Sequence, residues 1–334
     1  ESAVFDSADP DQLLGGQPVS FDAVDTAADD VALLAFTSGT TGSPKATMHF
    51  HRDVMAMADI VGGRLLGMRA DDLVVGSPPL GFTFGLGASL VFPLRFGAAV
   101  LLVESPAPDV LLGGIQARLV SGLFTAPTMY RAMLSRLERF DISSLRFCVS
   151  AGEALPKPTS NAWFEATGLR IIDGIGATEL IHIFIGAAGD EIRPGATGKP
   201  LPGYKACVLD DDDQPLPPGS TGRLAVKGPT GCRYLDDERQ QDYVVNGWNV
   251  TGDTYHVDED GYFWFQARAD DMIVSSGYNI AGPEVEAALL GHTAVAECAV
   301  VGAPDAERGH IVKAFVVLAD GVDPGDELTQ ELQD

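Results

Sequence analysis

The sequence has few cysteines, no long uninterrupted apolar run and no leader-like segment. Its four cysteines lie far apart and form no CxxC pair, so neither a zinc site nor a disulfide framework is indicated. The most apolar stretch, residues 84–103, contains Pro93 and Arg95, which favours buried helix and strand over a membrane span. No signal peptide is evident at the first residues, so we expect a reducing, cytoplasmic setting.

Positive charge is also scarce. The 334 residues carry 22 Lys and Arg, six of them Lys, against 47 Asp and Glu, which gives a formal net charge of −25. A field of this sign repels nucleic acid and anionic membranes, so neither is expected as a partner. Dense carboxylates with few lysines fit a surface adapted to high salt, and an ordinary acidic composition explains them equally well.

A polar, glycine-containing stretch at residues 37–45 organises the sequence. It consists of Thr-Ser-Gly-Thr-Thr-Gly-Ser-Pro-Lys and follows the uncharged run of residues 31–36, which predicts a buried strand that leads into a loop. Its glycines let backbone N–H groups turn toward an anion, its hydroxyls add donors, and Lys45 adds a positive charge. Pro44 and Ala46 stand where a Walker motif needs glycine and a hydroxyl. The stretch therefore predicts a phosphate-binding loop of another kind, with an ordinary solvated turn as the alternative.

Apolar periodicity predicts a layered α/β core over residues 30–194. A helical pattern over residues 53–66 places the glycine loop near a helix start, and short apolar runs then alternate with helical patterns. Residues 195–268 have short alternating strands with Gly, Pro and Asp, which predict a β-rich subdomain such as a small barrel. Residues 269–334 predict part of an α+β domain, and residues 1–29 a linker or the edge of a missing N-terminal region.

Five motifs in a fixed order resemble those of the adenylate-forming superfamily, which includes acyl- and aryl-CoA synthetases. The glycine loop is similar to its phosphate loop, residues 150–155 to the loop beside adenine, and residues 173–179 to the motif over adenine and the α-phosphate. Residues 248–253 resemble the ribose-binding Thr-Gly-Asp motif, and residues 267–271 the arginine-hinge motif. The resemblance implies the fold of that superfamily, with a large core followed by part of a small C-terminal domain.

The resemblance also implies which residues hold ATP and Mg²⁺. Thr178, Glu179 and Lys45 are the expected catalytic residues, and Glu179 is the expected ligand of Mg²⁺, which prefers oxygen ligands. Taken singly, each motif residue also has a plain structural explanation, such as a helix cap or a surface ion pair. The expected nucleotide-binding residues are Thr37, Ser38, Gly39, Thr40, Thr41, Gly42, Lys45, Gly152, Glu153, Asp173, Gly174, Thr178, Asp253 and Arg268.

Within the superfamily, residues 81–94 and 174–184 resemble benzoate-CoA and 2-aminobenzoate-CoA ligases. An aromatic slot with one imidazole suits a benzoate ring, because ring faces stack and a histidine can donate to a carboxylate. The alternative is that the two phenylalanines belong to the core and that the histidine is a satisfied buried one. A medium-chain fatty acyl-CoA synthetase is the runner-up, since residues 261–265 and 274–278 resemble those enzymes. The expected acid-pocket residues are Thr83, Phe84, Phe92, Gly176, His182 and Ile183.

The implied reaction is ATP-dependent formation of an acyl-adenylate and transfer of the acyl group to coenzyme A. The smaller domain would rotate about Asp270 in the second half-reaction. The family's C-terminal lysine has no counterpart before Asp334, so we expect part of a larger protein, or else a non-catalytic adenylate-binding module. Luciferase-like oxygenation and a homodimer are both kept open. The expected CoA-channel residues are Ser275, Ser276, Gly277 and Tyr278.

A salt-adapted surface predicts that the melting temperature rises between low and molar KCl. Added salt screens the repulsion among the carboxylates, which destabilises the compact state at low ionic strength. Differential scanning calorimetry over a KCl series at constant pH measures this effect. A melting temperature that stays constant or falls would leave the acidic surface as an ordinary feature of composition.

Overall fold

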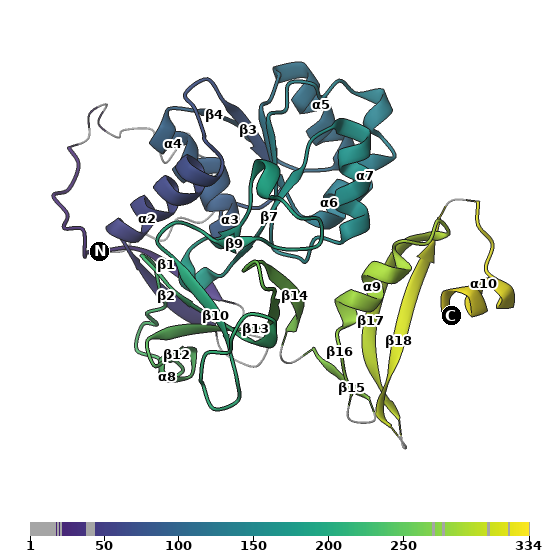
Figure 1. The fold of residues 1–334 in the computed structure, drawn as a ribbon. Coiled ribbons are helices and arrows are strands. Elements are labelled where there is room, and N and C mark those ends of the chain that lie inside the picture. Colours follow the sequence, from purple (N-terminus) through teal and green to yellow (C-terminus); the bar gives the residue numbers. More distant parts are fainter. Residues whose placement is uncertain are drawn as a thin grey trace.

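The computed structural model describes most of the chain as a mixed α/β protein. Within the described residues the strands form four β-sheets, and helices pack around the largest of them (Figure 1). No helix of this part of the chain has both the length and the apolar character needed to cross a membrane. The described residues are 18, 20, 22–37, 44–268, 271–275, 278–305, 308–319 and 321–333.

A seven-stranded sheet forms the centre of the larger part of the molecule, in the order β4-β3-β5-β6-β7-β8-β9. Pairing is parallel from β4 to β7 and antiparallel at β8 and β9. Strands β5 and β6 are buried throughout, as their short apolar sequences predict. The strands are β3 (Leu73–Gly76), β4 (Ala99–Leu101), β5 (Gly122–Thr125), β6 (Phe147–Ser150), β7 (Ile171–Gly176), β8 (Ile183–Gly186) and β9 (Lys199–Pro200).

Helices cover both faces of this sheet (Figure 1). Alternate residues of one strand enter different cores: Val74 belongs to the hydrophobic cluster that contains Phe92 on one face, and Val75 to the cluster that contains Trp163 on the other. The first face carries α2 (His51–Met57) and its π-helical continuation Ala58–Leu65, α3 (Thr83–Leu86) with Gly87–Val91, and α4 (Phe92–Phe96). The second carries α5 (Pro108–Arg118), α6 (Pro127–Leu134) and α7 (Lys157–Thr167). Short 3₁₀ turns span Leu137–Arg139, Thr178–Leu180 and Gly189–Glu191.

Strands β1 (Val31–Thr37) and β2 (Lys45–Phe50) form an antiparallel ribbon, and here two predictions from the sequence are wrong. Strand β1 is not buried, because Phe36 is 67% exposed and, of its seven residues, only Ala35 is buried. The loop between the strands leads into β2 and not directly into a helix, which begins at His51. An uncharged run does not say which strand faces are covered, and a two-stranded ribbon leaves one face open.

A five-stranded antiparallel sheet follows, in the order β10-β11-β13-β12 with β14 beside β13. Along β13 buried and partly exposed residues alternate, as in a strand with one covered face. The register between β13 and β14 places Asp253 opposite Arg268, two residues that the sequence assigned to one sugar. The elements are β10 (Lys205–Leu209), β11 (Ser220–Lys227), α8 (Gln240–Tyr243), β12 (Val244–Val245), β13 (Trp248–Val257) and β14 (Phe263–Arg268).

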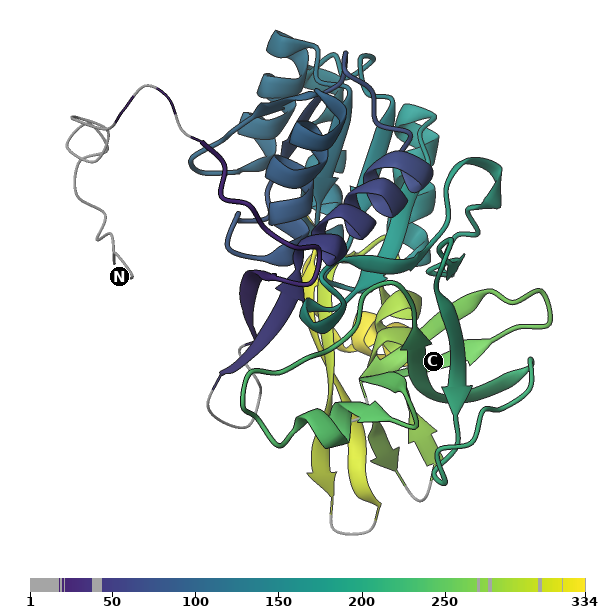
Figure 2. The same cartoon turned by 90° about the vertical axis from the view of Figure 1, so that its left-hand side faces the viewer.

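The C-terminal part forms a four-stranded sheet in the order β16-β15-β18-β17. It lies beside the five-stranded sheet, and helix α9 contacts both β17 and β14 (Figures 1 and 2). The predicted hinge, Asp270, lies outside the described residues. The elements are β15 (Ile273–Ser275), β16 (Tyr278–Ile280), α9 (Gly282–Leu289), β17 (Val295–Asp305), β18 (Gly309–Leu318) and α10 (Asp326–Gln333).

An ion pair between the buried Asp72 and the partly exposed Arg146 connects the start of β3 to the start of β6. Asp72 is 4% exposed and accepts hydrogen bonds from Ser121 Oγ at 2.8 Å, the N–H of Arg69 at 2.7 Å and Arg146 Nη2 at 2.5 Å. Burial favours the neutral carboxyl, but these hydrogen bonds outweigh it and lower the pKa of Asp72. The pair therefore stabilises the edge at which the parallel strands begin.

Replacing Asp72 by alanine is expected to lower the free energy of unfolding by about 2 kcal/mol near neutral pH, because the partly exposed Arg146 loses its carboxylate. The folded pKa lies below the unfolded value of about 4, so this stabilisation is present above the unfolded value and is lost as pH falls through the folded one. Urea unfolding of the parent and variant across that range measures the difference. The exposed neighbour Asp71, changed to alanine, is the control. A loss independent of pH would contradict the role of the charge.

Candidate active site

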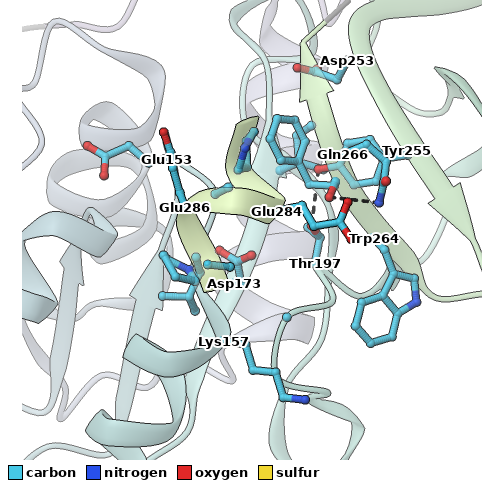
Figure 3. A pocket seen from close by; sticks show the side chains of 18 of the residues that line it. Glu153, Lys157, Asp173, Thr197, Asp253, Tyr255, Trp264, Gln266, Glu284 and Glu286 are labelled. Carbon is cyan, nitrogen blue, oxygen red and sulfur yellow. Dashed lines mark hydrogen bonds between the residues drawn. The ribbon is translucent and has the colours of Figure 1, made fainter. Parts of the chain in front are cut away.

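A cavity of about 420 Å³ lies at the carboxyl ends of β6 and β7, and strands β13 and β14 and helix α9 complete its wall (Figure 3). Its size is typical of small-molecule sites, which open sheets form at the carboxyl ends of their strands. The cavity therefore brings together residues of four separate sequence motifs. The predicted residues that line it are Gly152, Glu153, Asp173, Gly174, Gly176, Asp253 and Arg268.

Asp173 supplies a neutral carboxyl group to this cavity. Its Oδ1 is buried and has no hydrogen-bond partner among the described residues. Burial raises the pKa of Asp173 to about 8, and a hydrogen bond from the backbone of Gly174 opposes this in part. At neutral pH the group is therefore protonated, so it can both donate and accept a hydrogen bond.

Asp253 and Arg268 form a pair on the opposite wall. Arg268 Nη1 donates to Asp253 Oδ1 at 3.4 Å, and Asp253 is only 8% exposed. Gly252, which precedes the aspartate, has a φ of +81°, and a Cβ there would lie 3.3 Å from Arg268 Nη2. Glycine thus permits both the backbone conformation and the close approach of the arginine. The carboxylate has two oxygens, enough to accept from both hydroxyls of a ribose.

A second cluster contains two of the predicted catalytic residues. Lys45 Nζ lies 3.9 Å from Glu179 Oε1 and 4.6 Å from the centre of the Tyr234 ring. The hydroxyl of Tyr234 donates to Glu179 Oε1 at 2.5 Å. Burial, together with the hydrogen bond to Glu179 and its charge, raises the pKa of Tyr234, so the phenol stays protonated and remains a donor. The start of β2 and the turn after β7 therefore lie side by side, and both contact Tyr234.

The third predicted catalytic residue, Thr178, is held from β2 as well. His49 is fully buried, and its Nε2 donates to the carbonyl oxygen of Thr178 at 2.7 Å. Burial lowers the pKa of His49, although the carbonyl of Thr178 and the nearby carboxylates Asp53 and Glu179 oppose the shift. A carbonyl only accepts, so Nε2 carries the ring proton.

Sequence reasoning missed both His49 and Tyr234. A strand assignment for residues 45–50 would have found the histidine, because Lys45 and His49 are four residues apart and share one face of a strand. No local pattern marks Tyr234. It reaches the site because its segment pairs with β2, through a bridge between Thr47 and Tyr234.

The predicted acid-pocket residues gather around the ring of His182. Its centroid lies 4.9 Å from that of Phe92 and 5.7 Å from that of Phe84, and a Cβ on Gly87 would lie 2.5 Å from its Nε2. His182 is 3% exposed, and neither ring nitrogen has a hydrogen-bond partner within the described parts of the chain. Burial lowers the pKa of His182 to about 4, despite the nearby backbone of Phe84, so the ring is neutral at physiological pH.

These aromatic residues do not line the cavity of Figure 3, but they are connected to it. Gly176 lines the cavity, and a Cβ there would lie 2.9 Å from the carbonyl carbon of His182. Ile183 packs against Gly174, where a Cβ would lie 2.8 Å from its side chain. Thr83 begins α3 beside the cluster. Phe92 is also fully buried and belongs to the main core, as the alternative interpretation expected.

The structure places only part of the predicted phosphate and CoA segments. Thr37 ends β1, and Ser275 pairs with Tyr278 in the hairpin of β15 and β16. The roles assigned to all of these residues remain predictions. The site residues outside the described part of the chain are Ser38, Gly39, Thr40, Thr41, Gly42, Asp270, Ser276 and Gly277.

The donor set around Glu179 fits Mg²⁺ bound together with a nucleotide. Among the described residues, no group of three His, Cys, Asp or Glu side chains could hold a metal ion. Mg²⁺ is usually bound through one or two carboxylates and the phosphates of a substrate, and it keeps several waters. One carboxylate beside Lys45 therefore matches a metal that arrives with the nucleotide better than a site made by protein alone.

Family models confirm the class of protein that this site defines. The model described as AMP-binding enzyme matches residues 2–233, and the model of the AMP-binding enzyme C-terminal domain matches residues 284–334. The chain therefore belongs to the AMP-binding enzyme family, and the resemblance to adenylate-forming enzymes inferred from the motifs is confirmed.

Its relatives include aryl- and acyl-CoA ligases. A benzoate–CoA ligase of Thauera aromatica is 36% identical over 327 residues, which cover 96% of this chain and 62% of that protein. The mitochondrial acyl-coenzyme A synthetase ACSM3 of Mus musculus is 37% identical over 305 residues, 88% of this chain and 53% of that protein.

Two solved structures support the same assignment and the mixed α/β fold. The anthranilate CoA ligase AuaEII in complex with anthranoyl-AMP matches with a TM-score of 0.91 and 38% identity, covering 96% of this chain and 62% of that one. A benzoate CoA ligase from Burkholderia xenovorans LB400 matches with a TM-score of 0.87 and 32% identity, covering 96% and 65%. The chain thus spans about three fifths of the length of its relatives.

Changing Asp173 to asparagine is expected to stabilise the protein at high pH and to have little effect at low pH. The folded pKa of about 8 lies above the unfolded value of about 4, so the parent loses stability as pH rises through that interval. Asparagine has no charge to bury. Melting temperatures across the interval, with the exposed Asp190 changed to asparagine as control, measure the effect. Identical pH profiles for parent and variant would contradict the buried carboxyl.

Proposed function

We propose that this chain takes part in the ATP-dependent activation of an aromatic carboxylic acid, of the benzoate or 2-aminobenzoate type, and in its transfer to coenzyme A. One observation carries the proposal: a single segment, residues 173–183, touches three clusters in turn. Its first residues line the cavity, Glu179 faces Lys45, and His182 lies among aromatic rings. A nucleotide, its phosphates and an acid would meet along such a segment.

In the first half-reaction a carboxylate oxygen of the acid would attack the α-phosphorus of ATP, and the bond to pyrophosphate would break. Asp253 and Arg268 would position the ribose, while Lys45 and Thr178 would donate to the phosphates. Mg²⁺ held by Glu179 would supply neutralisation of the phosphate charge. The contribution of the chain is mainly to hold two reactants in line and to offset negative charge as pyrophosphate leaves.

The acid would lie against Phe84 and His182. A neutral imidazole whose two nitrogens have no hydrogen-bond partner among the described residues can donate to a carboxylate or to an ortho substituent without adding charge. Phe92 and His182 pack edge to face, an arrangement that aromatic pairs favour. The ring of an aromatic acid could pack against this cluster in the same way. The names of the relatives agree with this choice, since two of them act on benzoate and one on anthranilate.

In the second half-reaction the CoA thiolate would attack the acyl carbonyl and release AMP. The C-terminal part would rotate about Asp270 and bring the hairpin of β15 and β16 to the CoA channel. We also propose that the chain divides into an α/β core (30–194), a β-rich subdomain (195–268) and part of a C-terminal domain (269–334). A reaction that uses ATP and CoA would also agree with a cytoplasmic location.

An aliphatic acid is the second candidate. The relative ACSM3 is named an acyl-coenzyme A synthetase, and its identity of 37% is close to the 36% of the benzoate ligase, over a shorter match. The cluster of three rings formed by Phe84, Phe92 and His182 favours a flat acid over a flexible chain, because aromatic rings pack on one another and a planar acid loses little conformational entropy on binding.

Calorimetry with two non-hydrolysable adenylate analogues distinguishes the candidates. The chain is expected to bind a benzoyl-sulfamoyl adenosine about tenfold more tightly than the octanoyl analogue, because the aromatic slot matches only the first. The preference should weaken in His182→Ala and persist in His256→Ala, which changes a histidine away from the rings. Equal or inverted preference would assign the chain to aliphatic acids. Binding of neither analogue would contradict the proposed nucleotide site.

A further inference from the structure

The 3₁₀ turn Thr178–Leu180 is held at three successive residues by three side chains. His49 Nε2 donates to the first carbonyl at 2.7 Å, and the hydroxyl of Tyr234 donates to the glutamate side chain in the middle at 2.5 Å. Thr230 Oγ1 donates to the third carbonyl at 2.9 Å. All three donors come from outside the turn, so its conformation depends on tertiary contacts.

The backbone directly after the turn is strained. Ile181 has a φ of 66° and a ψ of −35°, although it is a β-branched residue. Such residues rarely adopt positive φ, and they keep this conformation only where the surroundings fix it. Ile181 is fully buried, and its N–H donates to the carbonyl of Thr178 at 3.1 Å. The carbonyl that accepts from His49 therefore also ends the strained turn.

The donors that hold the turn belong to two segments that are themselves paired. The N–H of Met48 donates to the carbonyl of Arg233 at 2.8 Å, and the N–H of Leu235 donates to that of Ala46 at 2.9 Å. Strand β2 begins with Lys45 and also contains His49. Any shift of the strand would move Lys45 and the turn together.

We propose that His49 is a positioning residue for Thr178 and Glu179, and that Thr230 is its counterpart at the other end of the turn. The ring of His49 is buried behind the turn, so it acts through the carbonyl of Thr178 and not on a ligand. Its hydrogen bond keeps the threonine hydroxyl and the glutamate carboxylate in the arrangement that phosphates and Mg²⁺ require. The inference rests on the proposed function of this turn.

Two parts of one ligand, ATP, would bind at different places. Adenosine would occupy the cavity lined by Asp173 and Asp253, whereas His49 and Thr230 are not among the described residues that line it. Mg²⁺ and the phosphates of ATP would contact the turn. Loss of a positioning bond should therefore weaken Mg·ATP and leave adenosine unchanged, whereas general unfolding would weaken both.

The test uses substitutions that remove one donor and keep the volume. His49→Leu removes the ring N–H, while His49→Gln can place an amide N–H near the position of Nε2. Thr230→Val removes the hydroxyl, and Thr221→Val removes a hydroxyl on β11 away from the turn, as the matched control. Isothermal titration of this chain with adenosine and with Mg·ATP gives both dissociation constants, and circular dichroism reports folding.

We expect His49→Leu and Thr230→Val to weaken Mg·ATP about tenfold and to leave adenosine unchanged, while His49→Gln stays within about threefold of the parent. The Mg²⁺ concentration at half-saturation should rise in the same two variants. Equal weakening of both ligands, or no change in either, overturns the positioning role. A parent chain that binds neither ligand overturns the proposed function and the inference with it.

Discussion

The rest of the candidate site depends on the contact between Lys45 and Glu179, whose carboxylate also accepts a hydrogen bond from the hydroxyl of Tyr234. The lysine ends the glycine loop, the glutamate belongs to the turn between β7 and β8, and the tyrosine comes from a segment that pairs with β2. At this turn the central sheet changes from parallel to antiparallel pairing. The fold thus places the carboxylate of Glu179, the ammonium group of Lys45 and a strained turn at the carboxyl end of the parallel strands, where open sheets bind ligands.

The electrostatics of the site agree with this arrangement. Under the proposed function a chain with a formal charge of −25 would bind a polyanion, yet the cavity of Figure 3 is lined by more acids than bases. The neutral form of Asp173 reduces that charge, and Asp253 is paired with Arg268. An acidic cavity suits the uncharged adenosine part of a nucleotide, and the phosphates would extend toward Lys45. Burial of His182 likewise keeps its ring neutral, so beside the proposed acid it would recognise shape and a hydrogen bond more than charge.

Several strands of the core and several residues of the candidate site could be predicted from the sequence, because apolar runs and motif residues indicate their structure and chemistry locally. Short apolar runs predicted β3, β5 and β6, and the motif around Asp253 and Arg268 predicted two residues that face each other in the structure. Exposure of β1 could not be predicted, since an uncharged run says nothing about what covers a strand. His49, Thr230 and Tyr234 were missed because their partners are backbone and side-chain atoms more than 45 residues away. No feature of the sequence indicated the positive φ of Ile181, because isoleucine rarely adopts that backbone conformation.

One segment, from Asp173 to His182, would bring nucleotide, phosphate and acid into line. A crystal structure of the chain with a benzoyl-sulfamoyl adenosine is the decisive measurement. We expect the adenine edge at Asp173, the ribose hydroxyls at Asp253, the sulfamoyl group near Thr178 and Lys45, and the benzoyl ring against His182. A ligand that binds in the cavity with its sulfamoyl group away from Lys45, or with its ring outside the aromatic cluster, would disprove this arrangement.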